Sequence, residues 1–338
     1  MNQKQTDLAH GSIGKLLFRL SIPTITSQIV NMLYNLVDRI YIGHMQPVES
    51  VGKLALTGVG VCLPIIMIIS AFASLMAMGG APRASIAEGS DRGKDAEQIM
   101  GNCFTMLVIT SIVLTILLQI FARPLLLTFG ASENTIGYAM DYIQIYSLGT
   151  IFVQITLGLN AYITAQGFTT VSMNTVLIGA ILNTILDPIF IFTFDLGVQG
   201  AALATVLSQA VSAIWVLRFL TGEKTKWRLR RTNLRPYGKV ILPCLALGLS
   251  PFIMQSTESL IAICFNSSLL SYGDDIAVGA MTVLTSIMQF AMMPLHGLTQ
   301  GAQPIISFNF GAKNAERVRT AFQILLRACL IYSLSLWA

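Results

Sequence analysis

Four acidic residues lie inside long apolar runs of the sequence: Asp38, Asp141, Asp187 and Glu258. An ionisable side chain at the centre of a membrane-spanning helix costs roughly 2.5 to 3.5 kcal/mol on insertion scales, so each acid needs a reason to be there. A buried carboxylate can bind a proton or a metal cation, and it attracts organic cations. Asp38 and Asp187 are therefore candidates for cation exchange. Asp141 lies near the outer end of its run, where it can reach water, and Glu258 fits either reading.

Polar side chains share helix faces with these acids. At about 100° per residue, the polar residues of the first apolar run fall within about 80° of one another. These are Thr24, Gln28, Asn31, Asn35 and Asp38. Such a stripe predicts a wet cavity, although Ser, Thr and Asn stripes also serve helix packing.

The fifth apolar run carries the second stripe. Asn183 and Asp187 lie four residues apart, and Pro188 removes the usual donor to the Thr184 carbonyl, which predicts a helix bend. The same spacing test adds polar residues and two methionines from other apolar runs to the cavity. Methionines there can adapt to varied apolar ligands. The further candidates are Thr156, Asn160, Thr205, Gln255, Gln289, Met292 and Met293.

The composition shows what must position these residues. Of the 338 residues, 54% are hydrophobic and 11% are charged, against about 25% charged in soluble chains, so a soluble protein is excluded. Nine apolar runs are predicted as membrane-spanning helices. They cover residues 14–42, 52–79, 98–121, 136–163, 168–193, 198–220, 238–265, 276–302 and 318–338.

The charges predict an orientation. With a cytoplasmic amino terminus, 17 of the 21 Lys and Arg residues fall on the inner side, as the positive-inside rule requires. The net charge of +5 therefore reflects topology rather than nucleic-acid binding. Five cysteines in apolar runs, without a CxxC or Cys/His cluster, predict neither disulfides nor a metal site.

The two parts of the chain weakly repeat each other. Gln28 matches Gln255, Gly80 matches Gly301 and Lys94 matches Lys313, at offsets near 220. Six spans separate the copies, so the repeat is parallel and predicts two six-helix bundles. A complete second copy would end near residue 450 by this offset, so we expect a carboxy-terminal truncation lacking about three spans.

The stretch LNTILDPIFIFTFDLGVQGAAL, residues 182–203, closely resembles the fifth-to-sixth-span signature of bacterial multidrug and toxic compound extrusion (MATE) transporters. The stretch DRIYIG, residues 38–43, is similar to the end of that family's first span. The segments Gly80 to Gly89 and Gly301 to Gly311 match its cytoplasmic loops. The resemblance covers essentially the whole chain.

The resemblance implies an all-α polytopic membrane protein with two lobes. These are a six-helix N-lobe (1–222), a basic cytoplasmic linker (223–237) and a partial C-lobe of about three helices (238–338). It also implies a coupling cluster in the N-lobe and a second-lobe glutamate, Glu258. The cluster residues are Asp38, Asn160, Asn183, Asp187 and Thr205.

The implied activity is export of varied, often cationic organic compounds, driven by exchange for protons or sodium ions. The expected protein is monomeric, lies among the lipids of the bacterial plasma membrane, uses no cofactor and is not an enzyme. One alternative is a flippase for lipid-linked precursors, which predicts a cationic cavity. A second is a prenyl-transferase-like enzyme, for which only Asp274-Asp275 faintly suggests a metal motif. A third is an inactive fragment.

Overall fold

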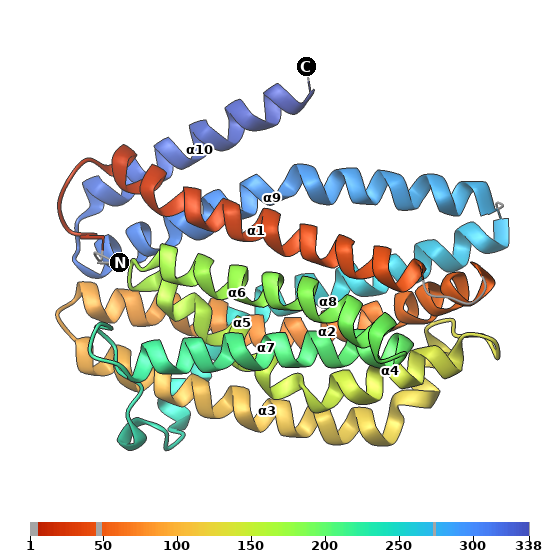
Figure 1. Cartoon of the computed structure of the whole chain (residues 1–338). Helices are drawn as coiled ribbons and strands as arrows, with labels where there is room; N and C mark the ends of the chain where they lie inside the picture. Colours follow the sequence, from red (N-terminus) through yellow and green to blue (C-terminus); the bar gives the residue numbers. More distant parts are fainter. Residues whose placement is uncertain (1–5, 45–48, 273–274, 338) are drawn as a thin grey trace.

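The computed structural model describes residues 6–44, 49–272 and 275–337, and all regular structure within them is helical (Figure 1). Asp274 lies outside these residues. The helices are α1 (Ile13–Gly43), α2 (Glu49–Gly89), α3 (Gly93–Thr128), α4 (Ile136–Leu148), α5 (Thr150–Ala165), α6 (Thr169–Pro188), η1 (Ile189–Thr193), α7 (Gly197–Thr221), η2 (Arg231–Asn233), α8 (Gly238–Tyr272), α9 (Asp275–Gly311) and α10 (Ala315–Trp337).

Six helices of the described residues are long and apolar enough to cross a membrane, and α4 with α5 makes a seventh if the pair counts as one span. The six are α2, α3, α6 with η1, α7, α8 and α10. The nine predicted spans also include α1 and α9, which are long helices but are not among these six.

The fourth predicted span, 136–163, is two helices rather than one. At Gly149, α4 ends and α5 leaves at an angle of 58°. A Cβ at Gly149 would overlap the side chain of Val206 on α7. The bend therefore occurs where the backbone approaches a neighbouring helix too closely for any side chain.

The two predicted cytoplasmic loops are also helical. Helix α2 continues through Gly80 to Gly89 and α9 continues through Gly301 to Gly311. The glycines permit close packing instead of chain reversal, because a Cβ at Gly80 would overlap Tyr162, and one at Gly301 would overlap the backbone of Ser21.

The turns that follow these two helices have the same conformation. Asp91 and Lys313, which are 313 − 91 = 222 residues apart, both have left-handed backbones with φ of 59° and 56°. The backbone N–H of the following residue, Arg92 or Asn314, donates to the carbonyl five residues earlier at a distance of 2.9 Å in both turns. This shared geometry supports the repeat, whereas the lobe boundaries stay a prediction. N-lobe and C-lobe below mean residues 1–222 and 238–338.

The amino-terminal segment, the α2–α3 turn, the linker 223–237 and the α9–α10 turn gather at one end of the bundle, called here the basic end (Figure 1). Lobe-to-lobe packing at this end is reciprocal. A Cβ at Gly89 would overlap the Phe308 carbonyl, and one at Gly311 would overlap the Ile86 carbonyl. The α2 and α9 ends therefore meet backbone to backbone, like two halves related by a two-fold axis.

Candidate functional site

A cavity of about 210 Å³ lies between α1, α2, α5, α6, α7 and α9, so both lobes contribute to its wall. Its polar lining consists of hydroxyl and amide side chains, and none of the described lining residues is charged. The polar lining residues are Thr24, Ser27, Gln28, Asn31, Tyr34, Ser74, Thr156, Asn160, Thr164, Ser172, Thr175, Asn183, Thr205, Ser208, Gln209, Ser212, Gln300 and Gln303.

Asn183 connects this cavity to a buried carboxylate. Its Nδ2 donates to Asp187 Oδ1 at 3.1 Å and to Thr205 Oγ1 at 3.4 Å. Asn183 and Thr205 line the cavity, whereas Asp187 lies one turn further along α6 and is 0% exposed. At Pro188 the α-helix ends and the chain continues as the π-helical turn η1. The missing Pro188 N–H thus coincides with a change of helix type.

Asp38 on α1 completes an acidic pair with Asp187. It is buried, and the two carboxylates are close enough to repel each other electrostatically. Oδ1 of Asp38, Oδ2 of Asp187 and Oδ1 of Asn183 are buried without a hydrogen-bond partner among the described residues. Uptake of a proton or a cation would relieve the repulsion and supply the missing partners.

Tyr34 belongs to this site, although the sequence reasoning did not select it. It lines the cavity, and its hydroxyl lies close to Gln209 of α7. Tyr34 precedes Asp38 by four residues and so shares its helix face. The spacing therefore carried the signal, but the polar stripe was defined by hydroxyl, amide and carboxylate side chains of Thr, Gln, Asn and Asp alone.

The other N-lobe candidates differ in their positions. Asn160 lines the cavity and donates to the Ser172 carbonyl at 3.3 Å, while its Oδ1 is unpartnered among the described residues. Gln28 donates to Gln300 of α9 at 3.1 Å and thereby joins the two lobes. Asn31 lines the cavity from an exposed position, whereas Asn35 is exposed and outside the described lining.

The C-lobe candidates are not gathered at the cavity. Gln255 of α8 bonds Ser74 at 3.1 Å, and Ser74 lines the cavity, so this glutamine lies just behind its wall. The others are outside the described lining: Glu258, Gln289 and Met292 are exposed and Met293 is half-buried. Among the described residues, no cluster of three or more His, Cys, Asp or Glu could hold a metal ion.

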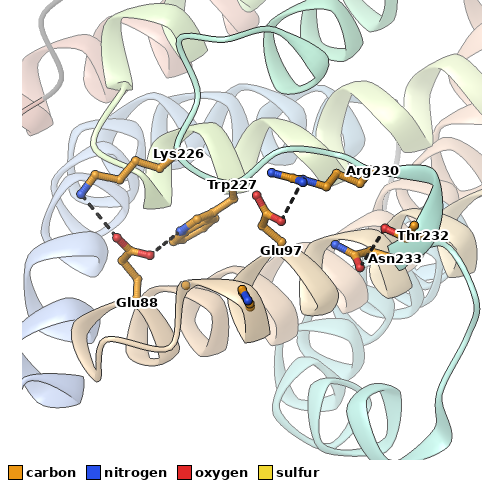
Figure 2. Close-up of a pocket in the computed structure, with 9 residues that line it drawn as sticks. Glu88, Glu97, Lys226, Trp227, Arg230, Thr232 and Asn233 are labelled. Carbon is orange, nitrogen blue, oxygen red and sulfur yellow. Dashed lines mark hydrogen bonds and ion pairs between the residues drawn. The ribbon is translucent and has the colours of Figure 1, made fainter.

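A second hollow, of about 430 Å³, lies at the basic end between the linker and the start of α3 (Figure 2). Glu88 accepts from Lys226 Nζ at 3.4 Å and from Trp227 Nε1 at 3.0 Å, and Glu97 pairs with Arg230 Nε at 3.3 Å. The indole of Trp227 is 1% exposed. The predicted basic linker is therefore docked on the N-lobe, with Lys226 and Arg230 paired to acids of α2 and α3.

Comparison with known proteins identifies the architecture. The model of the MatE family matches residues 23–189 and 251–338. The chain belongs to the MatE family of MATE transporters. Its helices and this membership make it a multi-pass membrane protein.

Relatives of this MATE protein include a protein named multidrug export protein MepA from Staphylococcus haemolyticus (strain JCSC1435). The two are 24% identical over 315 residues, which is 93% of this chain and 68% of the relative. A solved structure described only as protein A has a TM-score of 0.90 and 36% identity, over 98% of this chain and 74% of that one. Another, described as the outward-facing conformation of a multidrug resistance MATE family transporter, has a TM-score of 0.89 and 25% identity, over 98% and 73%.

Proposed function

We propose that this MATE protein exports organic, often cationic compounds by antiport against protons or sodium ions, with alternating access between two lobes. The observation that carries the proposal is the acidic pair Asp38 and Asp187, with unpartnered buried oxygens, beside a neutral polar cavity. Asn183 joins the two parts, since it bonds Asp187 and lines the cavity.

The acidic pair supplies the coupling step. Two neighbouring carboxylates in a low-dielectric site attract one positive charge, which an organic cation or a coupling ion can provide but not both at once. When an external proton or sodium ion neutralises the pair, the attraction for the organic cation is lost. The hydrogen bond from Asn183 also changes, and with it the packing near Pro188 and η1.

The distribution of contacts supports alternating access. Contacts between the lobes run from the middle of the bundle to the basic end: Gln28 with Gln300, Ser74 with Gln255, and the Gly89 and Gly311 turns. A cytoplasmic basic end, which the positive-inside rule favours, makes this arrangement outward-facing.

We place the protein in the plasma membrane with its amino terminus inside. Trypsin should then cut the linker in inside-out vesicles and spare it in right-side-out ones.

The lining distinguishes this proposal from the flippase alternative. A cavity for anionic lipid headgroups needs cationic side chains, and none of the described lining residues is charged. We therefore favour export of organic, often cationic compounds over a flippase activity. The proposal also includes a monomeric protein without a bound cofactor.

The deciding experiment is efflux of ethidium, an organic cation, from reconstituted vesicles under a pH gradient and, separately, a sodium gradient. Asp187→Asn should abolish gradient-driven efflux, since the amide cannot exchange a proton or pair with a cation. Asp141→Asn is the matched control, because Asp141 bonds Gln199 outside the described cavity lining. Undiminished efflux in Asp187→Asn would refute the coupling role. No efflux by the wild-type protein under either gradient would favour a flippase or an inactive chain.

A further inference from the structure

Two buried cysteines from different lobes meet near the basic end. Cys103 of α3 and Cys244 of α8 are each 0% exposed and belong to one apolar cluster. Their side chains lie close to each other. The sequence reasoning treated both as small hydrophobic residues, which explains their burial but not their contact across the lobe boundary.

Helix α2 forms the floor on which the two cysteines meet. A Cβ at Gly80 would lie 2.8 Å from the Cys103 sulfur, and one at Gly79 would overlap the Cys244 carbonyl. Two consecutive glycines therefore allow α3 and α8 to approach the same turn of α2. Backbone packing therefore fixes the positions of the two sulfur atoms, unlike those of a mobile pair on the surface.

Arg83, one turn further along α2, gives the pair chemical character. Its guanidinium lies close to the Cys244 sulfur, and its Nε is buried with no hydrogen-bond partner among the described residues. A cation beside a sulfur stabilises the negative charge that a thiol must develop before it can act as a nucleophile. The Tyr162 hydroxyl lies within hydrogen-bond reach of the Cys103 sulfur on the other side.

We propose that Cys103 and Cys244 are an oxidative modification site that forms a disulfide between the lobes. A hydroperoxide is the oxidant. One thiol, as its thiolate, attacks the peroxide O–O bond and becomes a sulfenic acid, releasing one water. The second thiol then attacks the sulfenic sulfur, forms the S–S bond and releases a second water. Two thiols and one hydrogen peroxide thus give one disulfide and two waters.

The disulfide would hold the lobes together where they already touch. Its consequence for transport rests on the proposed function, since alternating access requires the basic ends to separate. Oxidation would then arrest the protein in the present arrangement, and reduction would release it.

The test uses the trypsin-sensitive linker, which separates the two cysteines in the chain. Purified protein is treated with hydrogen peroxide, alkylated with N-ethylmaleimide and cut in the linker. Non-reducing gels should show the two fragments held together, and dithiothreitol should separate them. Cys103→Ser and Cys244→Ser should each abolish the cross-link. Cys62→Ser should not, because the Cys62 thiol donates to the carbonyls of Gly58 and Ala139.

Separate fragments from peroxide-treated wild-type protein, or a cross-link that survives Cys103→Ser, would overturn the site. The second readout is ethidium efflux, which peroxide should stop in the wild-type protein, dithiothreitol should restore, and Cys103→Ser should preserve. A cross-linked protein that still transports would overturn the proposed arrest. Wild-type protein without any efflux before oxidation contradicts the proposed function instead, and the cross-link still decides the site.

Discussion

Gln166, just after α5, is predicted to control whether the linker stays docked. Its Oε1 accepts three hydrogen bonds from the linker: Thr225 Oγ1 at 2.7 Å, Lys226 N at 2.9 Å and Trp227 N at 3.0 Å. Thr225 Oγ1 also donates to the Trp227 carbonyl at 3.1 Å, but Trp227 is 1% exposed, so its N–H has no ready access to water when the acceptor is removed. We predict that Gln166→Leu detaches the linker from the N-lobe.

The magnitude follows from the buried Trp227 N–H. Leaving a buried polar group without a partner costs about 1 to 3 kcal/mol, so the loss destabilises docking by at least about 1 kcal/mol. At about 1.4 kcal/mol per factor of ten, the detached population rises roughly 5-fold or more. Five Lys and Arg residues between 224 and 231 make the linker a trypsin target once it is detached. The cleavage rate under native conditions then reports the detached population.

The control is Gln166→Glu, which retains an oxygen acceptor for the linker and loses the Nε2 bond to the Tyr162 carbonyl, at 3.3 Å. It should be cut at close to the wild-type rate. Equal cleavage rates for Gln166→Leu and the wild-type protein would refute the reasoning, because they would mean that the three bonds do not hold the linker.

Three further changes test lobe packing, the amino-terminal segment and the α4–α5 bend. Thr24→Val removes a 2.6 Å hydrogen bond to an α9 carbonyl, worth about 0.5 to 1.5 kcal/mol, and should raise the population with separated basic ends about 2- to 13-fold. Spin-label distances between the lobes would measure it, and no shift relative to Thr24→Ser would contradict it. Arg317→Ala should speed hydrogen exchange in the amino-terminal segment, whose carbonyls this arginine holds at 3.0 and 3.5 Å. The exposed Arg319→Ala should not, and equal exchange in both would refute the contact. Gly149→Val should lower the thermal unfolding temperature in detergent by overlapping α7, at a cost of about 1 to 3 kcal/mol or more. Gly137→Val, which has open space around it, is the comparison, and equal melting temperatures would count against the packing reason for the bend.

The N-lobe site could be predicted from the sequence because helical periodicity decides it. The spacing of Asn183 and Asp187 alone places them on one helix face, and in the structure Asn183 donates a hydrogen bond of 3.1 Å to Asp187. Thr205 comes from another helix, and its own stripe placed it on the matching face. Periodicity identifies which face of a helix is polar, and that was sufficient where neighbouring helices pack tightly.

The C-lobe candidates show the limit of that reasoning. Gln289 and Met292 lie on the α9 stripe with Gln300, yet of these three residues only Gln300 lines the cavity. A stripe does not show where along its length a neighbouring helix diverges, because that depends on lobe packing over long distances in the chain. The helical continuation through Gly80 was missed for a related reason: glycine favours both turns and close helix contacts, and only the neighbours distinguish the two.

The polar faces of α1 and α9 also bear on how the chain is made. Helix α1 ends 311 − 43 = 268 residues before α9 does. At roughly 5 to 20 residues per second, the ribosome needs about 13 to 54 s to cover that stretch. During this time α1 lacks the C-lobe helix against which it packs in the finished protein, including Gln300, the hydrogen-bond partner of Gln28. The first helix to leave the ribosome is thus among the last to complete its contacts.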